Sequence, residues 1–104
     1  MNRVHRLQEL LASEPHDAFL RHALALELVK LGDDDAARQL FEQLLADQPD
    51  YVGSYYHLAK LLERQGHVAQ AIHTYHTGMG HAQKAGDRHA YAELQMALED
   101  LEDA

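Results

Sequence analysis

The sequence of 104 residues contains no cysteine and only two prolines. The absence of cysteine excludes a disulfide framework and any thiolate metal site, and it leaves the redox compartment open. No apolar run is long enough to span a membrane, and no charged-then-apolar leader follows Met1. We therefore expect no membrane partner and a cytoplasmic location.

Basic residues are also scarce, since nine Lys and Arg stand against 17 Asp and Glu, for a formal net charge of −8 with histidine neutral. A field of this sign repels phosphate backbones, so nucleic-acid binding is not expected. It favours a basic or apolar partner, unless the acidic surface serves only to keep a small domain soluble. The hydrophobic content of 46% is that of a globular chain of one domain.

The two prolines, Pro15 and Pro49, lie 34 residues apart, and the chain aligns with itself at this shift. In each repeat an apolar stripe at helical spacing ends at a glycine, and a second stripe follows. This pattern predicts an antiparallel helical hairpin. The aligned pairs are Leu24 with Leu58, Ala25 with Ala59, Leu28 with Leu62, Gly32 with Gly66, Ala37 with Ala71 and Phe41 with Tyr75.

Helix ends can be predicted from local chemistry. Asp17 is the expected N-cap of a helix over residues 18–31, and Gly32 supplies the left-handed residue that ends it. Three aspartates, Asp33 to Asp35, then begin the second helix, where carboxylates suit the positive end of the helix dipole. They lack the alternating spacing of a calcium loop.

The second repeat lacks a closing proline, because Gln83 stands at the aligned position. Its second helix, from Val68, is therefore expected to run on towards Lys84, or to kink at Gly78 and Gly80. The small side chains at Ala59, Ala71 and Gly78 predict a close approach between the two helices of this repeat.

Two further helices flank the repeats, which gives six helices and no strand. The first, over residues 2–13, resembles the second helix of a repeat, because Leu7 aligns with Phe41. The last, over residues 88–102, aligns Tyr91 with Tyr55 at a shift of 36 and resembles the first helix of a third repeat. Polar outer faces on both suit terminal capping elements.

A 34-residue period of helix, turn, helix and closing proline resembles the tetratricopeptide repeat (TPR) family, and the chain resembles a small stand-alone TPR protein. The resemblance implies an all-α fold, an α-solenoid of antiparallel helical hairpins in a single domain spanning 1–104. Its expected parts are an N-terminal capping helix (2–13), repeat 1 (17–49), repeat 2 (50–84) and a C-terminal capping helix (87–103). Arg21 departs from the pattern, because a large apolar residue is usual there. Either Phe19 or Leu20 compensates, or that end of the repeat is loosely packed.

In TPR proteins the first helix of each hairpin lines a concave groove that takes an extended peptide or a partner helix. Three of the expected groove residues are apolar and lie off the core stripe of their helix, which independently suggests contact with a partner. The alternative is that neighbouring helices cover them. The resemblance places in this groove Phe19, His22, Leu26, Val29 and Lys30 of repeat 1, and Gly53, Tyr56, Lys60, Glu63 and Arg64 of repeat 2.

The expected function is that of a protein–protein interaction scaffold, an adaptor that binds a peptide segment or partner helix of unknown identity. Lys60 and Arg64, one helical turn apart, predict a segment with an apolar anchor and an acidic end. The alternative is structural self-association, a homodimer formed through the same apolar surface.

Nine histidines leave a third alternative, metal binding, because His73 and His76 lie one helical turn apart near His81. No carboxylate lies on that stretch of helix, so we expect solvated histidines, no metal site and no cofactor. No glycine-rich phosphate loop, nucleophile elbow or paired-carboxylate arrangement is present. We therefore expect no catalytic residues and no enzymatic activity.

Overall fold

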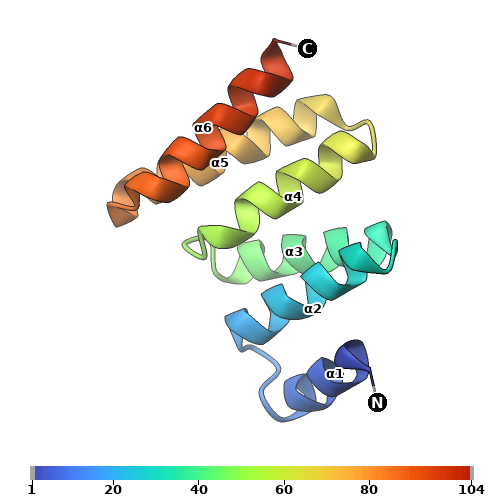
Figure 1. Cartoon of the computed structure of the whole chain (residues 1–104). Coiled ribbons are helices and arrows are strands. Elements are labelled where there is room, and N and C mark those ends of the chain that lie inside the picture. The colour runs from blue at the N-terminus through green and yellow to red at the C-terminus, as the bar shows by residue number, and fades with distance from the viewer. Residues whose placement is uncertain (1, 104) are drawn as a thin grey trace. The chain divides into compact units, whose positions relative to one another are not determined.

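The computed structural model describes residues 2–103, and these residues form six α-helices and no strand (Figure 1). The prediction of an all-α fold of antiparallel helical hairpins is confirmed. No helix among the described residues is both long enough and apolar enough to cross a bilayer. The helices are α1 (Arg3–Ser13), α2 (Ala18–Lys30), α3 (Asp34–Asp47), α4 (Gly53–Arg64), α5 (Val68–Ala85) and α6 (Arg88–Glu102).

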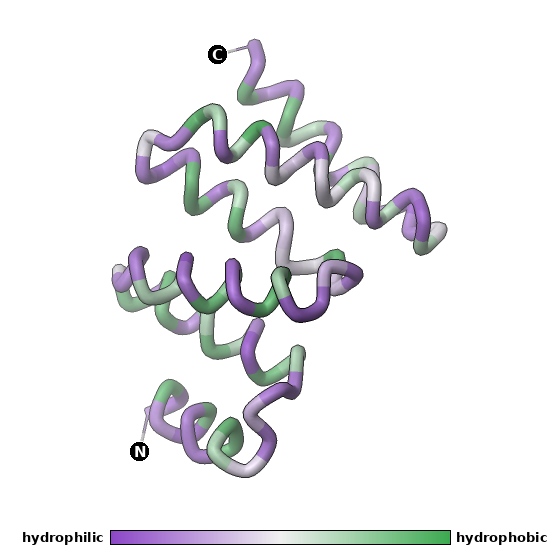
Figure 2. The backbone as a smooth tube through the Cα atoms, turned by 180° about the vertical axis from the view of Figure 1, so that it is seen from behind, coloured by the Kyte–Doolittle hydropathy of each residue, from purple (hydrophilic) through white to green (hydrophobic). Residues whose placement is uncertain are grey.

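The chain divides into two compact units, Met1–Gln48 and Pro49–Ala104. The first unit contains α1, α2 and α3, and the second contains α4, α5 and α6. The division falls at the proline that closes the first predicted repeat. Apolar and hydrophilic residues alternate along the helices of both units, as amphipathic helices require (Figure 2).

The helix ends follow the predicted chemistry. Asp17 Oδ1 accepts a hydrogen bond from the backbone N–H of Leu20 at 2.9 Å, so Asp17 is the N-cap of α2. Gly32 has φ of 81°, a left-handed conformation that a side chain would strain. Asp33 caps α3, and Asp34 and Asp35 lie in its first turn.

The core of the first unit lies between α2 and its two neighbours. Phe41 and Leu44 of α3 are fully buried, as are Ala25 and Ala37. On the side of α1, three buried residues form a cluster on which half-buried apolar side chains pack. The cluster is Leu7, Ala23 and Leu24, and the packed side chains are Val4, Leu11, Leu20, Leu28 and Leu40.

Arg21 occupies a core position, as its alignment with Tyr55 requires, and only 6% of it is exposed. Its Nη2 atom lies 3.0 Å from Oδ2 of Asp47, while Nη1 is buried without a hydrogen-bond partner among the described residues. The aliphatic stem fills space that an apolar residue would otherwise fill. Leu20 packs against the core and Phe19 is 66% exposed, so only Leu20 compensates.

The second unit is built around a close contact between α4 and α5. Gly78 of α5 is buried, and a Cβ atom at this position would lie 2.6 Å from Cβ of Tyr55 and 3.1 Å from Cδ1 of Leu94. No real Cβ atom tolerates the first distance, so this approach of the backbone requires glycine. Ala59 and Ala71, predicted to permit close approach, are both fully buried.

Helix α5 continues through both of its glycines and ends at Ala85, before Gly86 with φ of 70°. The prediction that it runs on towards Lys84 is therefore correct. Gln83 can donate the backbone hydrogen bond that a proline would remove. A Cβ atom at Gly80 would meet no neighbouring group within 4 Å, so packing does not require glycine there.

The two glycines give a matched test of this packing. Gly78→Ala should destabilise the protein by about 1–3 kcal/mol, because Tyr55 must shift to make room for the methyl group. Gly80→Ala should stabilise it by about 0.5–1 kcal/mol, because alanine is the better helix former and meets nothing. Thermal and urea unfolding followed by circular dichroism measure both. Equal effects of the two substitutions would contradict the observed contact.

Candidate functional site

A small cavity of about 160 Å³ lies between α4 and α6, within the second unit. It combines large apolar side chains with carboxylates and one lysine. We call it the α4–α6 cavity. Its lining consists of Tyr56 and Lys60 of α4 and Glu93, Met96, Ala97 and Asp100 of α6.

The apolar part of the cavity is partly open to solvent. Met96 is 67% exposed, which is unusual for a large apolar side chain, whereas Ala97 beside it is buried. Tyr56 is half-buried on the opposite helix. An unbranched thioether next to an aromatic ring is an adaptable contact surface, because methionine has three rotatable bonds and a polarisable sulfur.

The charged part of the cavity carries more acid than base. Lys60 Nζ lies 5.7 Å from the centroid of the Tyr56 ring and 3.8 Å from Oε2 of Glu63. Glu93 and Asp100 contribute two further carboxylates to the lining. Lys60 therefore does not make this end of the surface positive, and the structure gives no support to the predicted acidic end of a bound segment.

A polar link runs from the core of the second unit to Lys60. The hydroxyl of Tyr75, a residue that is fully buried, donates a hydrogen bond to Oε2 of Glu63. Burial raises the pKa of Tyr75, and the Glu63 carboxylate raises it further. Because the same carboxylate oxygen faces Lys60, Glu63 connects the core to the cavity rim.

His57 lies on α4 next to the cavity residue Tyr56. The two rings meet edge to face, with centroids 5.5 Å apart and an interplanar angle of 88°. Burial lowers the pKa of His57, and the nearby Glu93 carboxylate opposes this shift only in part. The neutral imidazole is therefore favoured in the folded protein.

The predicted groove residues of the first unit all lie on α2. Phe19 is exposed, Leu26 and Val29 are half-buried, and the ring of His22 meets Phe41 at a centroid distance of 5.8 Å. This unit thus leaves one large aromatic side chain in solvent.

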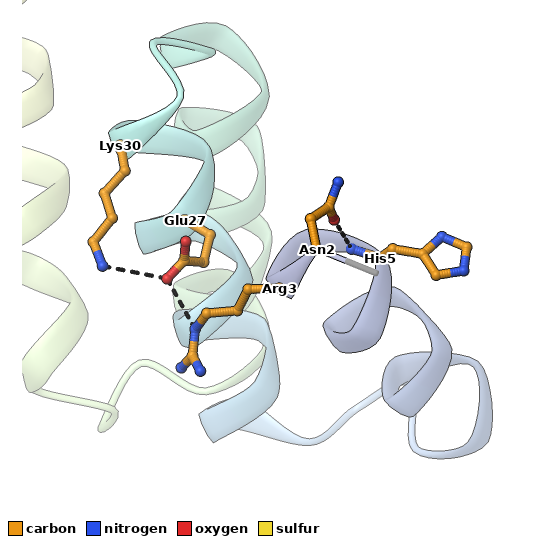
Figure 3. A network of polar contacts seen from close by, with 5 residues as sticks. All are labelled: Asn2, Arg3, His5, Glu27 and Lys30. Atoms are coloured by element: carbon orange, nitrogen blue, oxygen red, sulfur yellow. Dashed lines mark hydrogen bonds and ion pairs between the residues drawn. The ribbon is translucent and has the colours of Figure 1, made fainter.

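Lys30, the fifth predicted groove residue on α2, shares a carboxylate with α1 (Figure 3). Its Nζ atom lies 3.3 Å from Oε1 of Glu27, and Nε of Arg3 lies 2.8 Å from the same oxygen. The Glu27 carboxylate therefore offsets part of the positive charge of Lys30 and ties α1 to α2.

The structure brings together only part of the predicted site. Tyr56 and Lys60 line the α4–α6 cavity, Glu63 contacts Lys60, and Arg64 is exposed outside the lining. That these residues and the α2 residues form one continuous surface stays a prediction.

The contribution of α6 to the lining is absent from the groove predicted by sequence. The shift of 36 residues that aligns Tyr91 with Tyr55 also places Met96 at the position of Lys60 and Asp100 at the position of Arg64. The groove positions of α4, extended to α6 at this shift, therefore include both Met96 and Asp100.

The histidine pair considered for metal binding gains no further ligand. His73 and His76 are exposed on α5, and His81 stacks on Tyr55 with centroids 5.6 Å apart. Within residues 2–103 no group of three or more His, Asp or Glu side chains is placed to hold a metal ion.

Comparisons with known proteins agree with the fold. The family model of the tetratricopeptide repeat matches residues 28–90, which is more than half of the chain. A TPR repeat-containing protein of Pseudomonas aeruginosa is 26% identical over 101 residues, covering 97% of this chain and 96% of its own length.

Solved structures are also similar to this chain. A tetratricopeptide repeat domain protein from Salinibacter ruber, solved by NMR, is 44% identical with a TM-score of 0.82, and the match covers 86% of this chain and 90% of that one. A protein from Bordetella parapertussis is 29% identical with a TM-score of 0.86, covering 99% and 90% respectively.

The lowered pKa of His57 predicts a pH-dependent loss of stability. Because the folded state disfavours the charged imidazole, the contribution of His57 is present above the unfolded pKa of about 6.5 and is lost as the pH falls below it. The NMR titration midpoint of His57 should lie below 6.5. The unfolding free energy of His57→Gln should fall less between pH 7 and pH 5 than that of the wild type. A midpoint above 6.5 would contradict the assignment.

Proposed function

Because this chain belongs to the tetratricopeptide repeat family, we propose that it binds a segment of a partner protein in the α4–α6 cavity. The family is a protein-interaction fold that carries out no catalysis, and the proposed role is that of a non-catalytic adaptor. A cytoplasmic location stays a prediction.

The observation that carries this proposal is the exposed Met96 opposite Tyr56. A single exposed apolar residue is ordinary on a protein surface, but this one lies in a concave surface with an aromatic ring and a buried alanine. An apolar side chain inserted between Met96 and Tyr56 would be removed from water and would contact both of these side chains. This supports an apolar anchor in the bound segment.

The charges around the cavity support a basic group in the same segment. Glu93 and Asp100 line the cavity, and Glu63 already faces Lys60, so carboxylates outnumber ammonium groups three to one. The net charge of −8 on the whole chain adds an attractive field for a cation. The proposed partner segment therefore has a large apolar residue flanked by lysine or arginine.

The face of α2 in the first unit is proposed as an additional binding surface. Phe19 is exposed there, with half-buried Leu26 and Val29 along the same helix. Exposed aromatic residues are frequent anchors in protein interfaces. A second apolar anchor of the partner would contact this face.

Self-association through the same surface is the alternative prediction. Two copies related by a two-fold axis would place the surplus carboxylates of one cavity against those of the other. Like charges in contact cost free energy, so the lining favours a partner of opposite charge over a second copy.

Selection from a displayed peptide library tests the proposed function. Peptides retained by the wild type should be enriched in Lys and Arg next to a large apolar residue. Tyr56→Ala/Met96→Asp should lose at least about tenfold in affinity for them, because it removes both apolar walls of the cavity.

The matched control for this selection is Val68→Asp, which changes another exposed apolar residue of the second unit. It should bind the selected peptides as the wild type does. Enrichment of acidic peptides would refute the charge assignment. Equal binding by a folded Tyr56→Ala/Met96→Asp variant would refute the cavity as the site.

A further inference from the structure

One face of α4 carries an ammonium group between an aromatic ring and a carboxylate. Tyr56, Lys60 and Glu63 lie at successive turns of the helix, so they share this face. Nζ of Lys60 lies 5.7 Å from the centroid of the Tyr56 ring and 3.8 Å from Oε2 of Glu63. The first distance is within the range of a cation–π contact, and the second is that of an ion pair. The chain therefore supplies its own cation to this part of the α4–α6 cavity.

The carboxylate in this arrangement is held from inside the second unit. The hydroxyl of Tyr75 on α5 donates a hydrogen bond to the same Oε2 atom of Glu63, and Tyr75 is fully buried. Because a buried ring has a fixed packed position, this bond fixes the place of the carboxylate oxygen. Burial, and then the hydrogen bond to Glu63, raise the pKa of Tyr75, so its hydroxyl stays protonated and can donate at neutral pH.

A second carboxylate reaches the same place from α6. Asp100 lines the α4–α6 cavity together with Tyr56 and Lys60. Its charge also contributes, after burial, Glu63 and Tyr56, to the raised pKa of Tyr75. Groups from α4, α5 and α6 therefore converge on one end of the cavity, where two carboxylates surround one ammonium group.

Lys60 is held only loosely in this position. Its side chain is 44% exposed, and its distance of 3.8 Å to Glu63 exceeds the length of about 2.7–2.9 Å that a charge-assisted hydrogen bond has. Exposed ion pairs contribute little to stability, because water and salt screen them. A cation from outside can therefore replace Lys60 at little cost, while Tyr75 continues to hold Glu63.

We propose that Lys60 occupies a cation subsite in the free protein, and that an ammonium or guanidinium group from outside binds there by displacing it. The subsite consists of the Tyr56 ring and the Glu63 carboxylate, and Asp100 adds negative charge. Lys60 is the built-in competitor of the ligand, and Tyr75 is the positioning residue of the subsite. That the external cation belongs to a partner segment rests on the proposed function, whereas the subsite itself does not.

The competition predicts an unusual sign for the effect of removing a lining residue. A residue that contacts the ligand weakens binding when it is removed. Removal of Lys60 should instead strengthen the binding of a cation, because the Glu63 carboxylate is then available without a displacement step.

The probe n-butylammonium, which is the lysine side chain without its backbone, tests the subsite without any partner protein. NMR titration of the whole ¹⁵N-labelled chain follows the amide signals of Tyr56 and Glu63, with sodium chloride keeping the total salt constant. Lys60→Gln should bind the probe with a dissociation constant of about 100 mM or below, at least about threefold more tightly than the wild type. Glutamine has nearly the helix propensity of lysine, so α4 is preserved.

The matched control is Arg64→Gln, which removes the same charge one helical turn further along α4, outside the cavity lining. It should bind n-butylammonium within about twofold of the wild type, because salt screens exposed charges. A Lys60→Gln variant that binds no better than the wild type overturns the proposal. An equal gain in Arg64→Gln also overturns it, because any loss of positive charge would then suffice.

The role of Tyr75 is tested in the Lys60→Gln background with two probes of nearly the same shape. The neutral n-butanol can contact only the apolar walls, whereas n-butylammonium also requires the carboxylate. Adding Tyr75→Phe or Glu63→Gln should weaken the binding of n-butylammonium about threefold or more. The response of the Met96 methyl signal to n-butanol should not change. Equal losses for both probes would show that Tyr75 only maintains packing, and would overturn its positioning role.

Failure of this proposal differs from failure of the proposed function in the same set of samples. If a peptide rich in leucine and lysine shifts the Met96 signal while Lys60→Gln gains nothing for n-butylammonium, the subsite is overturned and the proposed function is supported. If Lys60→Gln gains affinity for n-butylammonium and no peptide binds, the subsite is supported and the proposed function is refuted.

Discussion

The second unit depends on the close approach of Gly78 to Tyr55. A single side chain, Tyr55, packs its Cβ against the α5 backbone, stacks its ring on His81 and donates a hydrogen bond at 2.6 Å to the carbonyl oxygen of Pro49. Leu94 of α6 lies against the same glycine. The three helices α4, α5 and α6 are thus fixed to one another at one point, and this contact sets the separation of the two walls of the α4–α6 cavity.

The acidity of the chain acts locally as well as through its net charge. In the first unit Glu27 approaches both Arg3 and Lys30, and in the second Glu63 faces Lys60 while it binds the Tyr75 hydroxyl. The positive charges of Arg3, Lys30 and Lys60 are therefore offset by carboxylates of the same molecule. The carboxylates of α6 are left in surplus. This distribution of charge supports a lysine or arginine in the proposed partner segment.

Local chemistry was sufficient to predict the helices and their ends, because caps such as Asp17 and turn residues such as Gly32 act over a few residues. The small residue Gly78 predicted a close approach of two helices, but its partners Tyr55 and Leu94 could not be predicted in this way, since they lie on other helices. The same holds for Lys60, because the carboxylates of Glu93 and Asp100 that oppose its charge lie on the facing helix. Met96 was not predicted because the groove positions, unlike the repeat alignment, were not extended to α6.

The central claim is that Met96 and Tyr56 form the apolar anchor site for a basic segment, and the methionine methyl signals report on it directly. With ¹³C-labelled methionine, a peptide rich in leucine and lysine should shift the NMR signal of Met96 and leave that of Met79, on α5, in place. The counterpart peptide with glutamate for lysine should have no effect at the same concentration. A Met96 signal that does not respond to the basic peptide, or that responds equally to the acidic one, would contradict the account.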